Sequence, residues 1–245
     1  SAWLWWALPW AGALVVIAAR AGAGKSSIAV ALADNLARHG AVGVFWLEDD
    51  WRDFTCRCLA RRRKITMAAL RHGTALAKEH GAEEALQAER ITPGIPRIFI
   101  DDTHDLTAHE IASRMRRLHH DHGCRTFIAD HLGEIRLDRD ERWGDRHDLS
   151  LGRAARIFRN TAKDLDALPI LVCQMNREIE RRSDQRPRMS DIDGSGQIEQ
   201  AARLIAFLGR EANHAKLHLA KNTLGKAKGE ITLRWLEDHM TMEDI

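Results

Sequence analysis

Short apolar runs alternate with longer stretches of helical periodicity along this chain, and that alternation constrains the fold more than any other feature. Strands are predicted at residues 13–19, 42–48, 97–101, 125–130, 169–174, 203–209, 216–221 and 230–235. Helical patterns are found at residues 25–39, 51–62, 66–89, 107–122 and 150–167. Most of the early runs are continuously apolar, as strands buried on both faces are. The pattern predicts an α/β fold with a mostly parallel central sheet, helices on both faces and antiparallel strands at the carboxyl terminus.

The first predicted strand leads directly into the segment ARAGAGKSS, and the first predicted helix follows. Gly24, Lys25 and Ser26 occupy the last three fixed positions of the phosphate-binding pattern G-x-x-x-x-G-K-[S/T], whereas Ala19 stands where the first glycine is usual. In such a loop the backbone N–H groups wrap the phosphates, and the start of the helix faces them. We therefore predict that Mg-ATP binds here, on residues Ala21, Gly22, Ala23, Gly24, Lys25, Ser26 and Ser27.

Three predicted strands end on polar residues that suit phosphoryl transfer, namely Glu48, Asp130 and Gln174. Lys25 is expected to reach the β- and γ-phosphates, while Ser26 and Asp130 are expected to hold Mg²⁺. Glu48, on a strand expected next door to the P-loop strand, is predicted to activate the attacking water. Each strand-end residue taken alone is equally well explained as an exposed polar group. Together with the P-loop, however, they predict one catalytic site.

Several segments are similar, in order, to one known family: AARAGAGKSS (18–27), FWLEDD (45–50), FIADHLGEI (127–135) and AKNTLGKAKGEITLRW (220–235). Over roughly residues 12–243 the chain resembles the RecA-like motor domain of DnaB-type replicative helicases, in which alanine is common at the first P-loop position. The resemblance implies one RecA-like P-loop NTPase domain over residues 1–245, without the family's amino-terminal domain and linker helix. It also implies a homo-oligomeric, usually hexameric ring that threads single-stranded DNA in the 5'-3' direction and hydrolyses ATP at subunit interfaces.

The resemblance also assigns roles to single residues. Catalytic positions of the family fall on Lys25, Glu48, Gln174 and Lys221. Lys221 matches the lysine that reaches the γ-phosphate bound by the neighbouring subunit. The family's arginine finger lies two residues further on, where this chain has Thr223. Trans-activated hydrolysis then depends on a replacement cation, for which the candidates are Arg210, Lys226 and Lys228.

Two stretches without apolar periodicity, residues 134–150 and 177–197, follow predicted strands and are dense in arginine and aspartate. In open α/β sheets, ligands sit in loops at the carboxyl ends of strands. We expect these two loops to contact a DNA backbone through Arg136, Arg186, Gly194 and Gly196. Acidic residues are interleaved with the arginines, so two solvated loops are the alternative. Asp193 also stands where the family's DNA-facing turn has arginine.

Composition adds few constraints on partners. The formal net charge is only +2, so any nucleic-acid surface must be local. The four cysteines are scattered, which is typical of free thiols in a reducing cytosol. The apolar amino terminus has no signal-peptide pattern, which favours a cytoplasmic protein without a membrane partner. The functional hypotheses are an ATP-dependent helicase motor, a degenerate paralogue that binds nucleotide but hydrolyses it poorly, and a RecA-type recombination or signalling ATPase.

Overall fold

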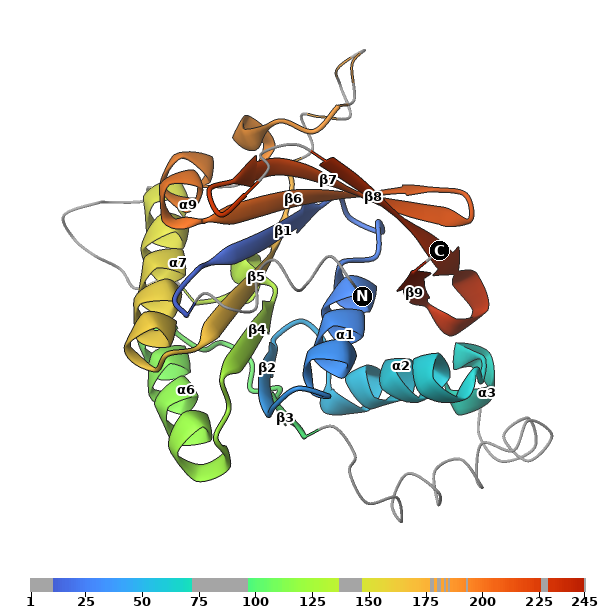
Figure 1. Cartoon of the computed structure of the whole chain (residues 1–245), viewed down its shortest axis with the longest axis horizontal. Helices are drawn as coiled ribbons and strands as arrows, with labels where there is room; N and C mark the ends of the chain where they lie inside the picture. Colours follow the sequence, from blue (N-terminus) through green and yellow to red (C-terminus); the bar gives the residue numbers. More distant parts are fainter. Residues whose placement is uncertain are drawn as a thin grey trace.

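The computed structural model describes residues 11–71, 97–136, 147–176, 186–192, 194–225 and 229–244, together with residues 179, 182 and 184. Within these residues nine strands form one sheet in the order β3-β2-β4-β5-β1-β6-β7-β8-β9 (Figure 1). The strands are β1 (Val15–Ala19), β2 (Val42–Trp46), β3 (Ile98–Asp101), β4 (Thr126–Asp130), β5 (Leu168–Gln174), β6 (Leu204–Glu211), β7 (His214–Asn222), β8 (Gly229–Leu236) and β9 (Thr241–Asp244).

The sheet is parallel from β3 to β6 and antiparallel from β6 to β9, as the sequence predicts. One expectation about strand order is wrong. The strand that precedes Glu48, β2, does not lie next to β1, because β4 and β5 stand between them. The last strand, β9, was not predicted, since its four residues carry no apolar run of their own.

Alternate residues of β1 enter two separate apolar layers, which is why the P-loop strand is buried on both faces. Val15 and Ile17 pack in the layer that includes Ile28 of α1 (Lys25–Leu36) and Phe54 of α2 (Trp51–Arg63). Val16 packs in the opposite layer, with residues of α6 (Ala108–His122), α7 (His147–Asp164) and α9 (Ser195–Ala201). Figure 1 shows the two groups of helices on opposite sides of the sheet, which confirms the predicted arrangement.

Local hydrogen bonds and backbone conformation explain where α6 begins and ends. Thr107 caps α6: its hydroxyl accepts the N–H of Glu110, whose carboxylate accepts the N–H of Thr107 in return. Gly123, with a φ of 68°, ends the same helix. Of the helix expected over residues 66–89, the structure describes α3 (Met67–Arg71), and residues 72–96 lie outside the described part.

The expectation of an irregular loop over residues 177–197 is wrong at its carboxyl end, where α9 begins. Gly194, with a φ of 71°, precedes the first turn of α9, and Ile198 and Ala201 are buried beneath it. A Cβ at Gly152 of α7 would lie 2.3 Å from the Cβ of Gln197, so the two helices pack at close range. Only two apolar residues anchor this helix, so the sequence shows little periodicity there. Residues 147–150, likewise expected to be loop, belong to α7.

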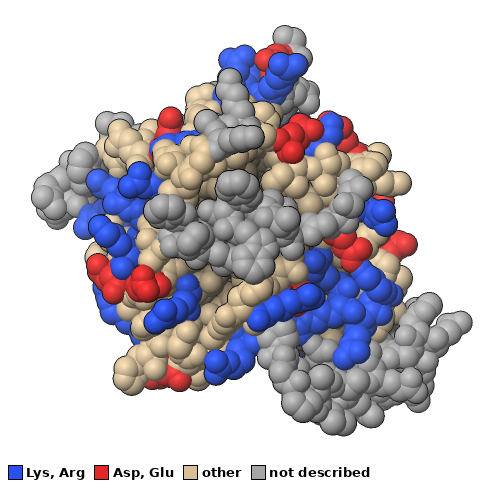
Figure 2. Space-filling model, viewed as in Figure 1, with Lys and Arg blue, Asp and Glu red and all other residues tan. Residues whose placement is uncertain are grey.

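A buried ion-pair cluster joins α1, α2 and β9. The carboxylate of Asp34, 1 % exposed, accepts from Arg61 Nε at 3.3 Å and from Arg62 Nε at 2.6 Å. Arg61 also donates to Thr241 Oγ1 at 3.2 Å. Figure 2 shows Lys and Arg side chains gathered over α2, whose last turn carries Arg61, Arg62 and Arg63. Part of that positive patch is therefore used inside the fold.

Replacing Asp34 with alanine should lower the free energy of unfolding by roughly 3 kcal/mol, because it leaves two guanidinium groups without their buried counter-charge. Urea denaturation of the chain measures this loss. Asp166→Asn is the matched control, because the Arg125–Asp166 pair is long, at 3.7 Å, and exposed, and asparagine tolerates the positive φ of 50° at this position. That variant should lose less than about 1 kcal/mol. Equal losses in the two variants would contradict the structural role of Asp34.

Candidate nucleotide-binding site

The P-loop joins β1 to α1 in the strand–loop–helix arrangement that the motif requires. Gly22 and Gly24 have φ values of 73° and 97°, a region that side-chain-bearing residues rarely adopt. A Cβ at Gly24 would also lie 2.6 Å from the Cε of Met242 in β9. Within α1, Ile28 is the residue whose N–H reaches back to Gly24. The N–H groups of residues 25–27 therefore have no acceptor inside the helix and are available to phosphate.

Lys25 and Gln174 are in direct contact, although they are far apart in the sequence. Lys25 is buried, and its Nζ donates to Gln174 Oε1 at 2.8 Å. The contact follows from the sheet, because β1 and β5 pair in parallel with Ala19 beside Gln174. The structure thus places the predicted γ-phosphate lysine and the predicted strand-end glutamine at one point, directly under the P-loop.

Asp130, at the end of β4, lies close enough to this lysine for the charge of Lys25 to lower its pKa. Its carboxylate is 1 % exposed, and Ser26 of the P-loop forms a hydrogen bond with it. Burial raises the pKa of Asp130 to about 6, the hydrogen bond from Ser26 opposes that change, and the negative charge of Glu48 adds to it. One carboxylate oxygen, Oδ1, has no hydrogen-bond partner among the described residues. A buried carboxylate with an unused oxygen beside a hydroxyl is a donor set that suits Mg²⁺.

Glu48 follows β2 by two residues, and its side chain is half exposed. Among the described residues, the imidazole of His131 is the one cation-capable group at ion-pair distance, with its Nε2 3.4 Å from Glu48 Oε2. Burial and the charge of Lys25 lower the pKa of His131, while Glu48 and Glu134 raise it by smaller amounts. The structure therefore brings Glu48 and Asp130 together at the ends of neighbouring strands, because Trp46 of β2 pairs with Asp130 of β4.

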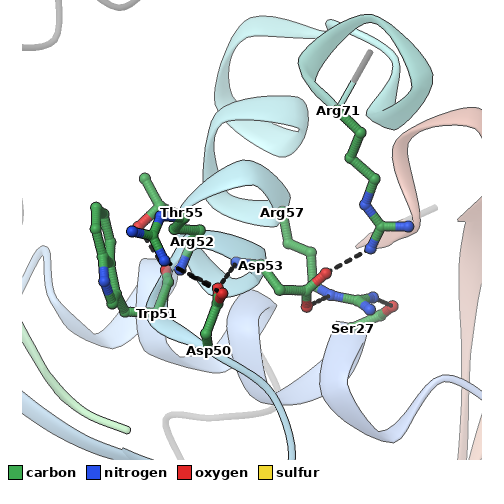
Figure 3. Close-up of polar contacts among 8 residues, drawn as sticks. All are labelled: Ser27, Asp50, Trp51, Arg52, Asp53, Thr55, Arg57 and Arg71. Carbon is green, nitrogen blue, oxygen red and sulfur yellow. Dashed lines mark hydrogen bonds and ion pairs between the residues drawn. The ribbon is translucent and has the colours of Figure 1, made fainter. Parts of the chain in front are cut away.

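Ser27, predicted to bind nucleotide, has its hydroxyl turned into the protein. Arg57 of α2 donates to Ser27 Oγ at 3.4 Å and to Asp53 Oδ2 at 2.5 Å. Figure 3 shows Asp53 between Arg57 and Arg71, and Asp50 at the start of α2, where its carboxylate accepts the N–H groups of Arg52 and Asp53. The network links the P-loop helix to α2. Arg57 was not predictable as part of this site, because its one signal in the sequence is the i,i+4 spacing from Asp53.

Lys221 lies away from this site. It pairs with Ile205 near the amino-terminal end of β6, whereas the P-loop leaves the carboxyl end of β1, beside Leu208. The Nζ of Lys221 donates to the carbonyl of Glu199 at 2.5 Å. Beyond Lys221, both the N–H and the hydroxyl of Thr223 donate to the carbonyl of Arg203.

A pocket of about 550 Å³ opens beside Thr223 at this same end of the sheet. Of the described residues that line it, three are cationic, namely Arg159, Lys163 and Arg203, and none is acidic. Arg210, one candidate to replace the arginine finger, lies instead near the carboxyl end of β6, over the ring of Trp235. It is therefore at the wrong end of the sheet to act beside Lys221. The candidates Lys226 and Lys228 lie outside the described residues.

The four residues expected to contact DNA differ in their surroundings. Arg136 donates to Asp105 Oδ2 at 2.8 Å and lies 3.4 Å from Glu110 Oε2, so two acidic neighbours balance its positive charge. Arg186 is exposed, in the segment between β5 and α9. Gly194 precedes α9, and Gly196 is exposed in its first turn. Asp193 lies outside the described residues.

Within the described segments, no helix combines the length and apolar character needed to cross a bilayer. Nor do three or more His, Cys, Asp or Glu side chains of those segments gather into a metal site of their own. A cation held by Ser26 and Asp130 therefore needs further ligands, such as the oxygens of a phosphate group and water.

The raised pKa of Asp130 predicts how stability depends on pH in metal-free buffer. The folded chain holds this proton to about pH 6, whereas the reference value is 3.8, so stability falls as pH rises through that interval. The loss amounts to about 3 kcal/mol at most. Asp130→Asn removes it, so the variant should melt higher than the wild type at pH 8 but similarly at pH 4. Asp166→Asn controls for the lost charge, and melting curves displaced equally at both pH values would contradict the prediction.

Comparison with known proteins places the chain in a family. The model of the DnaB-like helicase C terminal domain matches residues 10–244. The chain is 33% identical over 204 residues to the replicative DNA helicase DnaB of Pasteurella multocida (strain Pm70), covering 81% of this chain and 42% of that protein. It is 31% identical over 213 residues to the replicative DNA helicase DnaC of Bacillus subtilis (strain 168), covering 86% and 46%.

Solved structures agree on the fold. A DnaB-like replicative helicase, described with its interactions with primase, has a TM-score of 0.85 at 24% identity and covers 96% of this chain and 57% of that one. The ATPase domain of G40P has a TM-score of 0.82 at 23% identity, covering 96% and 86%. These similarities confirm the predicted RecA-like fold, and the chain spans less than half the length of the curated relatives it matches. The chain belongs to the DnaB-like helicase C-terminal domain family.

Proposed function

We propose that this chain is the ATP-hydrolysing motor of a replicative DNA helicase that moves along single-stranded DNA in the cytoplasm. One observation carries the proposal: a P-loop and three strand ends place Lys25, Gln174, Asp130 and Glu48 around a single point. Each of these groups has a use in phosphoryl transfer to water. The names of the similar proteins, replicative helicases and an ATPase domain, support the same reading.

Ser26 and Asp130 would hold Mg²⁺, which when bound neutralises charge on the β- and γ-phosphates. Lys25 exchanges its contact with Gln174 for the γ-phosphate, leaving the amide of Gln174 free to contact the same group. Glu48 accepts a proton from water as the water oxygen forms a bond to the γ-phosphorus and the bond to the bridging oxygen of ADP breaks. The products are ADP and inorganic phosphate. The N–H groups of the P-loop keep the remaining phosphates in place.

We also propose that the site is completed by a second copy of the chain. Lys221 cannot serve the P-loop of its own chain, since it lies toward the opposite end of the sheet. The pocket lined by Arg159, Lys163 and Arg203 lies at that same end and suits the phosphates held by a neighbouring copy. A homo-oligomeric ring, a hexamer in the family's usual form, satisfies both placements.

DNA contacts are proposed for the segment that contains Arg186, Gly194 and Gly196, which follows β5 at the P-loop end of the sheet. Arg186 is exposed, so it can neutralise a backbone phosphate. Arg136 is the weaker candidate, because Asp105 and Glu110 already balance its charge.

Replacing Glu48 with glutamine tests the catalytic proposal. The variant keeps the side chain's shape but loses the base, so the rate of ATP hydrolysis should fall by about 10²–10⁴-fold while ATP still binds. Hydrolysis is measured on the full-length protein, with and without single-stranded DNA, and binding is measured by fluorescent-nucleotide titration. Lys25→Ala is the comparison that loses binding as well. A wild-type protein that binds ATP without hydrolysing it, even on DNA, would instead identify a nucleotide-binding paralogue.

Salt dependence tests the DNA proposal. The logarithm of the affinity for single-stranded DNA should fall linearly with the logarithm of the salt concentration, by about 0.7 per neutralised phosphate. Arg186→Ala should reduce that slope by about 0.7 and weaken binding to all sequences alike. The control is Arg125→Ala, an exposed arginine at the opposite end of the sheet, before β4. Fluorescence anisotropy with the assembled full-length protein gives both slopes, and identical slopes in the two variants would remove Arg186 from the DNA contact.

A further inference from the structure

His131 is a buried imidazole immediately after Asp130, and neither the motif nor the predicted roles use it. It stands at the start of a single 3-10 turn (Leu132–Glu134), where its Nδ1 accepts the N–H of Gly133 at 3.1 Å. An imidazole that accepts at Nδ1 carries its proton on Nε2. His131 is therefore a neutral hydrogen-bond donor through Nε2, and the groups that face this nitrogen are its possible acceptors.

The Nε2 of His131 points between two carboxylates. It lies 3.4 Å from Glu48 Oε2 and 3.5 Å from Glu134 Oε1. These separations are long for a hydrogen bond, but catalytic hydrogen bonds are often loose before substrate binds and tighten afterwards. Among the described residues, no other ion pair or hydrogen bond holds the Glu48 carboxylate, whose side chain is half exposed.

The ring of His131 is held far more firmly than the carboxylate it faces. The residue is only 6 % exposed. A Cβ at position 133 would lie 2.9 Å from the ring's Cε1 and 3.0 Å from its Nδ1, so the ring packs directly against the bare backbone of Gly133. A rigid donor next to a half-exposed carboxylate can limit the positions that the carboxylate takes.

We propose that His131 is the positioning residue for Glu48: its Nε2–H binds one carboxylate oxygen and leaves the other directed toward the attacking water. A neutral donor suits this task, because it orients the carboxylate without a full positive charge that would weaken it as a base. Glu134 is a second acceptor for the same N–H and competes with Glu48 when no substrate is present. This inference rests on the proposed role of Glu48 in ATP hydrolysis.

The test compares His131→Leu with His131→Gln in the full-length protein on saturating single-stranded DNA. The leucine variant has no donor, so kcat should fall about 10- to 100-fold while KM for ATP changes little. The glutamine amide places an N–H near the position of Nε2 and should restore most of kcat. His119→Leu is the matched control, since this histidine also makes a local backbone hydrogen bond through Nδ1, in its case to the carbonyl of Cys124, but lies at the far end of the sheet. It should keep kcat within about 2-fold of wild type.

A double-mutant cycle separates positioning from a structural effect. In a Glu48→Gln background, His131→Leu should cause no further loss of kcat, because the group that it positions is already gone. A loss by the same factor in both backgrounds would overturn the proposal while leaving the role of Glu48 intact. Full activity in Glu48→Gln itself would overturn both. If His131→Leu does not fold, Gly133→Ala displaces the same ring by steric contact and should give the same fall in kcat.

Discussion

The parallel pairing of β1 with β5 is the contact on which the rest of the site depends. It places Ala19 beside Gln174, so the loop that leaves β1 passes over the end of β5. Lys25 then meets the glutamine amide, and its burial becomes tolerable because its ammonium group has an acceptor. The next strand, β4, ends at Asp130 beside the carboxyl-terminal part of β5, and β2 brings the segment that carries Glu48. The register of the strands therefore sets where these residues lie, and loops alone would not fix their positions.

The carboxyl-terminal strands extend this site beyond the parallel core. Trp235 of β8 and Met242 of β9 lie close to Gly24: a Cβ there would collide with the Cε of Met242, at 2.6 Å, and press tightly on the ring of Trp235, at 3.2 Å. The same end of the chain is tied to α1 and α2 through Arg61, which binds both Asp34 and Thr241. The conformation of the P-loop therefore depends on strands that lie some 210 residues away in sequence.

Much of the fold was predictable from the sequence, and the reason is physical. Continuous apolar runs indicate strands buried on both faces, and each run stops where its strand leaves the buried part of the sheet. Glu48, Asp130 and Gln174 were therefore recognisable as residues at the carboxyl ends of strands. Strand order was not predictable in the same way, because pairing depends on crossovers that leave no local signal, and β2 was expected next to β1. The short elements α9 and β9 were missed because each has too few apolar residues to show a period.

The site was predictable where a residue's role follows from its position on a strand, and not where it follows from side-chain packing. Arg57 acts on Ser27 from a separate helix, and His131 depends on the space left by Gly133. Neither contact has a sequence pattern. Arg136 shows the opposite case. Its arginine-rich stretch of sequence suggests a contact with DNA, but the fold places its guanidinium group against the carboxylates of Asp105 and Glu110.

The placement of Lys221 gives the proposed assembly a direction. Each chain would carry a nucleotide cradle at one end of its sheet and a cationic pocket at the other, so contacts between copies are head-to-tail. An open row of such subunits always has one cradle with no neighbour to complete it, whereas a closed ring has none. Closing the row into a ring therefore adds one complete ATP site per assembly. As a fraction of all the sites, this gain is largest in rings with few subunits. A subunit whose only defect lies in its cationic pocket would stop hydrolysis of the ATP bound by its neighbour, while the ATP in its own P-loop would still be hydrolysed. The loss of activity would therefore appear in the subunit next to the altered one.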